Sequence, residues 1–195
     1  MKKLASILTL AVACMSNMAW ADFGVPSGDY ALEDTHGYIT FSYSHLGFST
    51  PHISFNKFTV DLQADSANPA NSKISVVIDA TSIDSRVDEF DEHLNGSDYF
   101  DTANHPTITF NSTGIEQSSD TMLVVTGDLT IKGVAKPVTL NVTINKAADH
   151  PMRKVPTIGI SAGGKLSRTE FGLGKFAPVV GDEVTLYITA ELIKS

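Results

Sequence analysis

From Tyr30 onward the sequence alternates apolar and polar residues in short segments separated by turn-forming residues. In one such segment Ile39, Phe41 and Tyr43 alternate with threonine and serine. Because successive side chains of a β-strand point to opposite faces, this pattern predicts strands with one apolar face. Many short strands between turns are typical of an antiparallel sheet that closes into a barrel or folds into a sandwich.

The same alternation recurs in the segments 58–62, 74–80, 108–110, 122–131, 138–144, 158–166 and 184–190. The first two flank a polar loop, 64–72, which contains Asn68 and Pro69, and this arrangement predicts a hairpin. A second turn is expected at 132–137. The sequence therefore predicts an all-β fold of about eight strands, a number at which a closed barrel can hold one small ligand.

The segment 82–101 lacks this alternation of apolar and polar residues and predicts the one helix of the chain. Its apolar residues fall at helical spacing, at Ile83, Val87, Phe90 and Leu94. We expect the helix to be capped near Ser82 or Asp84. The remaining face carries acidic residues without calcium-loop spacing, at Asp84, Asp88, Asp91 and Glu92, so we expect a solvated face rather than a cation site.

The N-terminus has the three parts of a secretory signal peptide. Lys2 and Lys3 precede an apolar run at 4–13, and small residues form a cleavage site that ends at Ala21. The apolar run is about half as long as a membrane-spanning helix requires. We therefore expect residues 1–21 to be removed before Asp22 and the protein to be exported to the periplasm.

Cys14 is the only cysteine of the chain and could also end a lipoprotein processing site. Ala11 stands where such sites usually have leucine, so we expect cleavage after Ala21 and no lipid on Cys14. Residues 22–195 then have no thiol for a disulfide, a thiolate metal site or a cysteine nucleophile. Their length suits a single domain.

The charge of the mature chain excludes some classes of partner. The sequence has 14 basic and 22 acidic residues, and loss of Lys2 and Lys3 leaves 12 basic residues, which changes the net charge from -8 to -10. We therefore expect no binding to nucleic acid. No later segment is apolar enough to span a bilayer, so we expect no stable membrane insertion. The oligomeric state stays open, and a homodimer is compatible with the sequence.

Two features of the sequence are compatible with an enzyme. Residues 159–163 match the GxSxG nucleophile elbow, but that motif requires a strand, a tight turn and a helix, whereas Ser161 lies within an alternating strand pattern. Histidines occur at His36, His45, His52, His93, His105 and His150. None of them forms an HxH or HExxH pair, so we expect structural or loop roles, no metal site and no cofactor.

Five segments carry recognisable motifs in order. They are His-Leu-Gly-Phe at 45–48, Asp-Glu-His-Leu followed by Asp-Tyr-Phe-Asp at 91–101, the proline strand at 105–110, the segment 127–138, and Arg-x-x-Phe-Gly at 168–172. Read together, they resemble the YceI-like family of exported lipocalin-like barrels. The resemblance extends from about Tyr30 to Leu192.

This resemblance implies an extended antiparallel barrel whose bore binds a long apolar lipid, such as a polyisoprenoid or an isoprenoid quinone-like molecule. We expect the inward residues of the alternating strands to line the bore, at Phe41, Phe58, Phe110, Leu129, Ile131, Leu140, Val142, Leu186 and Ile188. Three further phenylalanines are expected near its mouth, at Phe48, Phe55 and Phe171. Each buried methylene would contribute about 0.8 kcal/mol to the binding of such a tail.

The chain departs from the family pattern at a few positions. Phe90 and Asn95 stand where the family usually has arginines, so head-group contacts of those arginines are not carried over. Ser54 and Thr59 replace common glycines. We expect Arg168 either to contact a head group or, as the preferred hypothesis, to form an ion pair that closes the barrel.

The leading hypothesis is therefore a non-catalytic periplasmic protein that carries or sequesters an isoprenoid lipid. Two alternatives remain open. One is a small exported enzyme that uses converging histidines or Ser161. The other is a β domain that docks a partner of the cell envelope through its acidic surface.

Overall fold

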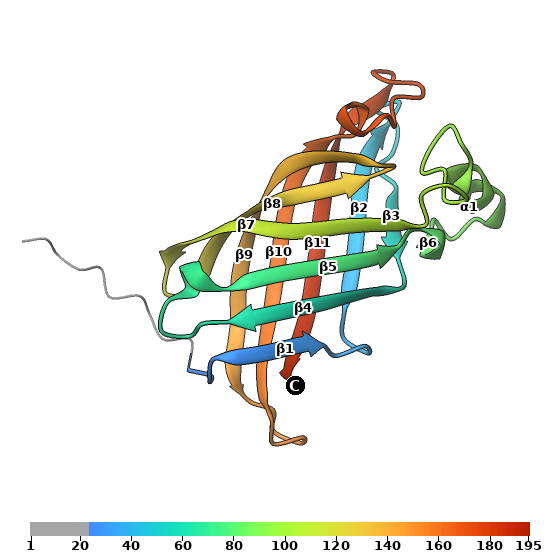
Figure 1. Cartoon of the computed structure of the whole chain (residues 1–195). Coiled ribbons are helices and arrows are strands. Elements are labelled where there is room, and N and C mark those ends of the chain that lie inside the picture. Colours follow the sequence, from blue (N-terminus) through green and yellow to red (C-terminus); the bar gives the residue numbers. More distant parts are fainter. Residues whose placement is uncertain (1–23) are drawn as a thin grey trace, which may run out of the picture.

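A computed structural model describes residues 24–195 of the chain (Figure 1). Its strands are β1 (Gly28–Leu32), β2 (Tyr38–His45), β3 (His52–Phe55), β4 (Phe58–Ala64), β5 (Lys73–Asp79), β6 (Ile83–Asp84), β7 (Thr107–Ser119), β8 (Met122–Ile131), β9 (Val134–Asp149), β10 (Pro156–Ser167) and β11 (Val180–Lys194). Its helices are α1 (Asp88–Asn95) and the short 3-10 turns η1 (Pro69–Asn71), η2 (Ala80–Ser82) and η3 (Arg168–Phe171). The expected signal peptide and Cys14 lie outside the described residues.

Eight strands close into an antiparallel barrel in the order β1-β4-β5-β7-β8-β9-β10-β11, and β1 also pairs with β11. At this closure Tyr30 lies opposite Lys194, and Leu32 lies opposite Leu192. The predicted hairpin around 64–72 is present as the pair β4–β5, in which Val60 lies opposite Val76. The antiparallel sheet expected from the alternating pattern is confirmed, and so is its closure into the barrel that the family resemblance implies.

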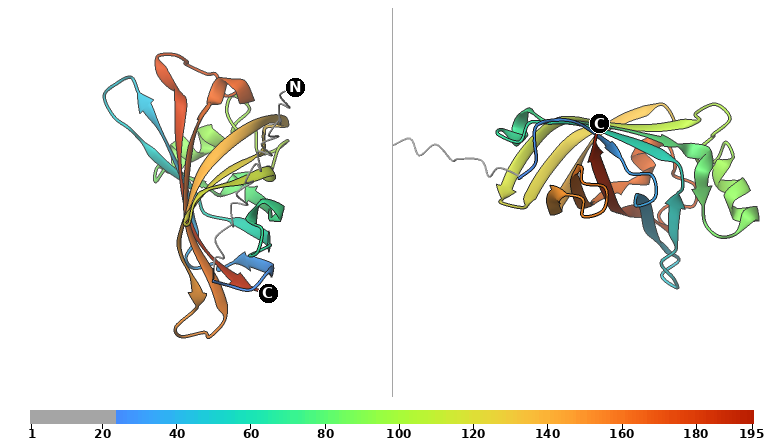
Figure 2. Two further views of the ribbon diagram at one scale, coloured as in Figure 1. Left: turned by 90° about the vertical axis from the view of Figure 1, so that its left-hand side faces the viewer. Right: turned by 90° about the horizontal axis from the view of Figure 1, so that it is seen from below.

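The strands β2, β3 and β6 extend the sheet beyond the closed barrel. Strand β2 pairs with the first part of β11, where Phe41 lies opposite Leu186, and β3 pairs with both β2 and β6. Since β1 and β2 lie against successive parts of β11, the chain bends between them, at 33–37. Figure 2 shows the β2–β3 tip and the segment that precedes β11 protruding together past the barrel.

Strand β8 illustrates how the sequence determines which side chains point inward. Leu123, Val125, Gly127, Leu129 and Ile131 are buried, whereas the residues that alternate with them are exposed or half-buried. Gly127 belongs to the same inward row. A Cβ at this position would lie against the Phe110 ring and 2.5 Å from the backbone oxygen of Asn111, so the glycine gives that ring room inside the barrel.

The predicted helix is present but shorter than expected, because α1 begins at Asp88 and ends at Asn95. Ile83 and Asp84 instead form β6, where Ile83 lies opposite Phe55 of β3. Strand pairing thus outweighs helical spacing in this segment. No helix within residues 24–195 combines the length and the apolar character needed to cross a bilayer.

Candidate functional site

The barrel encloses a cavity of about 450 Å³, a volume within the range of small-molecule sites. The wall consists mainly of inward apolar side chains from β2 to β5 and β7 to β11. All but two of the residues predicted to line a bore lie in this wall: Phe41, Phe55, Phe58, Phe110, Leu129, Ile131, Leu140, Val142, Leu186 and Ile188. The period-two pattern therefore identifies one shared face of the strands, and ligand contact by these residues stays a prediction.

Two residues that were expected near the mouth are absent from the cavity wall. Phe48 is at the turn between β2 and β3, where its side chain is 90% exposed. Phe171, in η3, is 1% exposed and belongs to the packed core rather than to the cavity wall. Both residues lie outside regular strands, so alternation along a strand carries no information about where their rings point.

The segment around α1 covers one end of the cavity. Phe90, Leu94, Tyr99 and Phe100 all line it. The Phe100 ring meets the Phe55 ring edge-on at 5.6 Å, and the Phe41 ring lies 5.8 Å from that of Phe55. The helical spacing of Phe90 and Leu94 in the sequence indicates an apolar face on this segment, but it does not show that the face covers the cavity.

The opposite end of the cavity is covered by η1, which lies far from α1 in the barrel (Figure 1). Pro69 is buried there and lines the cavity. Asp65 holds the preceding loop, because its side chain accepts hydrogen bonds from Asn71 Nδ2 at 3.0 Å and from the backbone N–H of Asn68 at 2.9 Å. These bonds, with that of Asn71 foremost, lower the pKa of Asp65.

Polar side chains gather at the α1 end of the wall, at Tyr43, His45, Tyr99, Arg168 and Lys175. Burial raises the pKa of the Tyr43 hydroxyl, and the nearby Tyr99 adds to this effect while Arg168 opposes it. The Tyr43 hydroxyl is therefore neutral at physiological pH and can donate or accept a hydrogen bond. A ligand in the cavity would meet apolar groups along its length and polar groups at this mouth.

Arg168 does not form the ion pair that was the preferred hypothesis for it, and its contact with a head group stays a prediction. Its buried guanidinium donates to backbone oxygens, from Nε to Gly181 at 2.9 Å, from Nη2 to Val180 at 2.8 Å, and from Nη1 to Leu173 and Lys175. Within the described part of the chain it forms no ion pair with a carboxylate. Arg168 therefore fixes the segment 173–181, and its positive charge stays beside the mouth.

Lys175 connects two segments across the mouth. Its Nζ forms an ion pair with Asp98 Oδ2, which joins the loop after α1 to the loop before β11. The Nζ also lies 5.8 Å from the centre of the Tyr99 ring and 5.4 Å from that of Phe176. The hydrogen bond from Lys175 lowers the pKa of Asp98, and the same bond raises that of Lys175.

Ser161 and five of the six histidines, which were considered for catalysis, lie outside the cavity wall. Ser161 is in the middle of β10, opposite Thr143, and its Oγ accepts a hydrogen bond from Asn145 Nδ2 at 2.9 Å. This is a strand position and not a strand-to-helix elbow. Of the histidines, only His45 is in the cavity wall.

Among residues 24–195, one group of side chains has the geometry to hold a metal ion. Glu33, His36 and Glu191 bring candidate ligand atoms within 4.8 Å of one another, outside the cavity wall. Arg153 Nη2 lies 2.6 Å from Glu33 Oε1 and already neutralises that carboxylate. A metal ion would have to displace this guanidinium.

Comparisons with known proteins agree with this architecture. The family model described as the YceI-like domain matches residues 30–192. Protein YceI of Escherichia coli is 35% identical over 167 residues, which cover 85% of this chain and 86% of that protein. The crystal structure of BcnA from Burkholderia cenocepacia has a TM-score of 0.74 and 25% identity, and the match covers 82% of this chain and 98% of that one.

A more distant solved structure shares the fold. It is a polyisoprenoid binding domain from Saccharophagus degradans, with a TM-score of 0.64 and 16% identity, and the match covers 85% of this chain and 98% of that one. The family model matches the barrel from within β1 to within β11. The chain therefore belongs to the YceI-like family.

Proposed function

We propose that this protein is a non-catalytic periplasmic carrier that holds or sequesters a long apolar lipid of the polyisoprenoid or isoprenoid quinone class in the barrel. The observation that carries this proposal is the cavity itself, which is apolar along its length and polar only near its α1 mouth, apart from Ser72 at the η1 end. The ligand class is supported by the polyisoprenoid binding domain of the same fold.

The physical argument concerns what such a cavity can bind. A large cavity with an apolar wall holds water poorly and takes apolar molecules instead. Each methylene that leaves water contributes about 0.8 kcal/mol, so a tail of several isoprene units offsets the entropy lost on association. Tyr43 and His45 can then meet a polar head at the mouth.

Native mass spectrometry after incubation with geranylgeraniol tests this proposal. Ala162 lines the cavity from β10, and Ala162→Phe places a phenyl ring in the bore. We expect the wild-type protein to take up geranylgeraniol and the variant to lose at least tenfold in affinity. Failure of the wild-type protein to load, or equal loading of Ala162→Phe, would contradict a ligand in the bore.

The neighbouring residue provides the matched control. Ser161 is exposed on the opposite face of the same strand, because adjacent side chains of a strand point to opposite faces. Ser161→Phe adds the same ring outside the barrel and should load normally. It also removes the hydroxyl required by a serine-enzyme hypothesis, so retained function in this variant argues against that alternative.

A further inference from the structure

Large apolar side chains are exposed on two neighbouring segments at the mouth, the turn 46–48 and the loop 175–179. The exposed fractions of these side chains are 45% for Leu46, 90% for Phe48, 63% for Phe176 and 68% for Val179. The register of the sheet places these segments side by side, because His45 at the end of β2 lies opposite Val180 at the start of β11. We call these four residues the mouth patch.

Leu46 does not suit the backbone conformation of the turn in which it lies. Leu46 and Gly47 have φ values of 56° and 74°, and Phe48 N donates to His45 O at 3.0 Å. Two consecutive positive φ values define a type I′ turn, which favours asparagine, aspartate or glycine at its first central position. Leucine is strained at this position and exposed, so local stability alone does not account for it.

The loop beside the turn also has a bulky, exposed residue at a positive φ. Phe176 has a φ of 62°, again a conformation that a bulky residue rarely adopts, and its ring is largely exposed. The same residue also belongs to the cavity wall. An apolar surface therefore continues from the bore, across Phe176, to the outer tips of both segments.

We propose that the mouth patch inserts into the interfacial region of a lipid bilayer, so that the ligand passes between membrane and bore without crossing water. This proposal rests on the proposed carrier function, because it is the lipid in the bore that requires a bilayer at its mouth. The two tips protrude past the barrel (Figure 2), and short protruding apolar tips suit shallow insertion.

The charge of the protein determines which bilayer fits. The sequence has a net charge of -8, so anionic lipid surfaces repel it. At the patch itself, Lys175 is paired with Asp98 and contributes little net charge. Insertion should therefore be driven by apolar burial and occur on zwitterionic phosphatidylcholine. Addition of anionic phosphatidylglycerol should weaken it, and salt should reduce the difference in binding between the two lipid compositions.

Flotation of the purified protein with phosphatidylcholine vesicles tests the proposal. The double variant Leu46→Asn with Phe48→Ser removes two exposed tips and gives the turn a residue that its φ favours, so its thermal unfolding should match or exceed that of the wild type. We expect its partition coefficient onto vesicles to fall at least tenfold. The control Met152→Ser removes an equally exposed apolar residue, 84% exposed in the β9–β10 loop at the other end of the barrel, and should float normally.

Loading with geranylgeraniol in the absence of vesicles separates this proposal from the carrier function. Leu46 and Phe48 do not line the cavity, so the double variant should load as the wild type does. A wild-type protein that loads but does not float, or a double variant that floats like the wild type, overturns the docking proposal and leaves the carrier function intact. A wild-type protein that sediments as a dimer and becomes monomeric in the double variant also overturns it, since the patch would then bind a second copy.

Discussion

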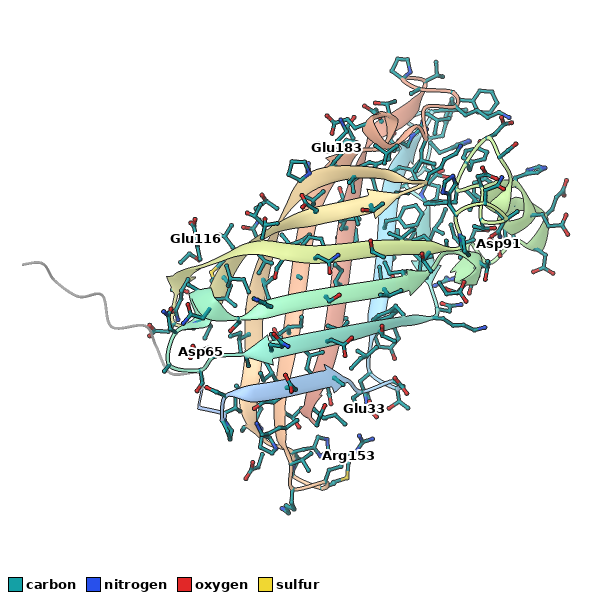
Figure 3. All side chains as sticks on the ribbon, in the orientation of Figure 1. Glu33, Asp65, Asp91, Glu116, Arg153 and Glu183 are labelled. Atoms are coloured by element: carbon teal, nitrogen blue, oxygen red, sulfur yellow. The ribbon has the colours of Figure 1, made fainter. Side chains whose placement is uncertain are left out.

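Arg153 Nη2 lies 2.6 Å from Glu33 Oε1 and joins the β9–β10 loop to the bend between β1 and β2 (Figure 3). The buried Glu33 carboxylate also accepts hydrogen bonds from Thr35 Oγ1 at 2.7 and 2.9 Å and lies 2.7 Å from His36 Nδ1. The hydrogen bonds from Thr35 and His36 lower the pKa of Glu33, and the hydrogen bond and charge of Arg153 add to this effect. The pKa falls from 4.5 to about 2.

The depressed pKa of Glu33 predicts a defined pH dependence of stability. A carboxylate whose pKa is lower in the folded state stabilises that state above its unfolded pKa and loses this contribution as the pH falls through the folded pKa. The urea midpoint of the wild type should therefore exceed that of Glu33→Gln above pH 4.5, and the gap should close toward pH 2. Urea titrations across this range measure the gap.

The control for this effect is Glu116→Gln, which neutralises an exposed carboxylate on β7. Its midpoint should follow that of the wild type at every pH. A gap between wild type and Glu33→Gln that stays constant from pH 4.5 to pH 2 would show that Glu33 acts through packing alone.

Replacement of Arg168 should loosen the loop that precedes β11. Arg168→Lys keeps the charge but cannot reach the four backbone oxygens that the planar guanidinium binds. Buried acceptors without donors typically cost about 1–3 kcal/mol each, so we expect a loss of about 3 kcal/mol in the free energy of unfolding. Faster amide exchange at Leu173 and Val180, whose N–H groups donate to Arg168 O and Phe176 O, reports the local change. Unchanged exchange there would contradict this role.

The strand pattern predicts much of the cavity wall because a period of two assigns each side chain to a face. Phe110 and Leu129 are predicted and observed on one face, and the register pairs them across β7 and β8. The role of Arg168 could not be predicted in this way, since its partners are backbone oxygens of a loop and no residue type identifies them. The helical spacing of apolar residues could not predict where α1 begins, because Ile83 pairs with Phe55 through a long-range contact that local spacing does not reveal.

Gly127 should be required for the shape of the bore. In Gly127→Ala the new methyl group would press on the Phe110 ring and on Asn111 O, so the ring or the backbone must move, at a cost of about 1–3 kcal/mol. We expect lower stability in urea unfolding and weaker geranylgeraniol loading. Gly114→Ala on β7 is the control, because a Cβ there meets nothing within 4 Å; equal effects of both substitutions would contradict the argument.

The ion pair between Lys175 and Asp98 should slow the exit of a ligand from the mouth. It joins the loop after α1 to the loop before β11, and Lys175 also lines the cavity. The pair is exposed enough that its loss should change overall stability little. In Asp98→Lys two like charges face each other, so the loops should separate and the transfer of bound geranylgeraniol to acceptor vesicles should accelerate about threefold or more.

The double variant Asp98→Lys with Lys175→Asp restores opposite charges with the sides exchanged. If the pair acts as a contact across the mouth, the transfer rate should return toward the wild-type value, and the non-additivity of the single substitutions measures the coupling between the two residues. Changes that simply add would mean that each residue acts alone. In that case the entrance to the bore would be controlled by the apolar rings of Tyr99 and Phe176, which flank Lys175.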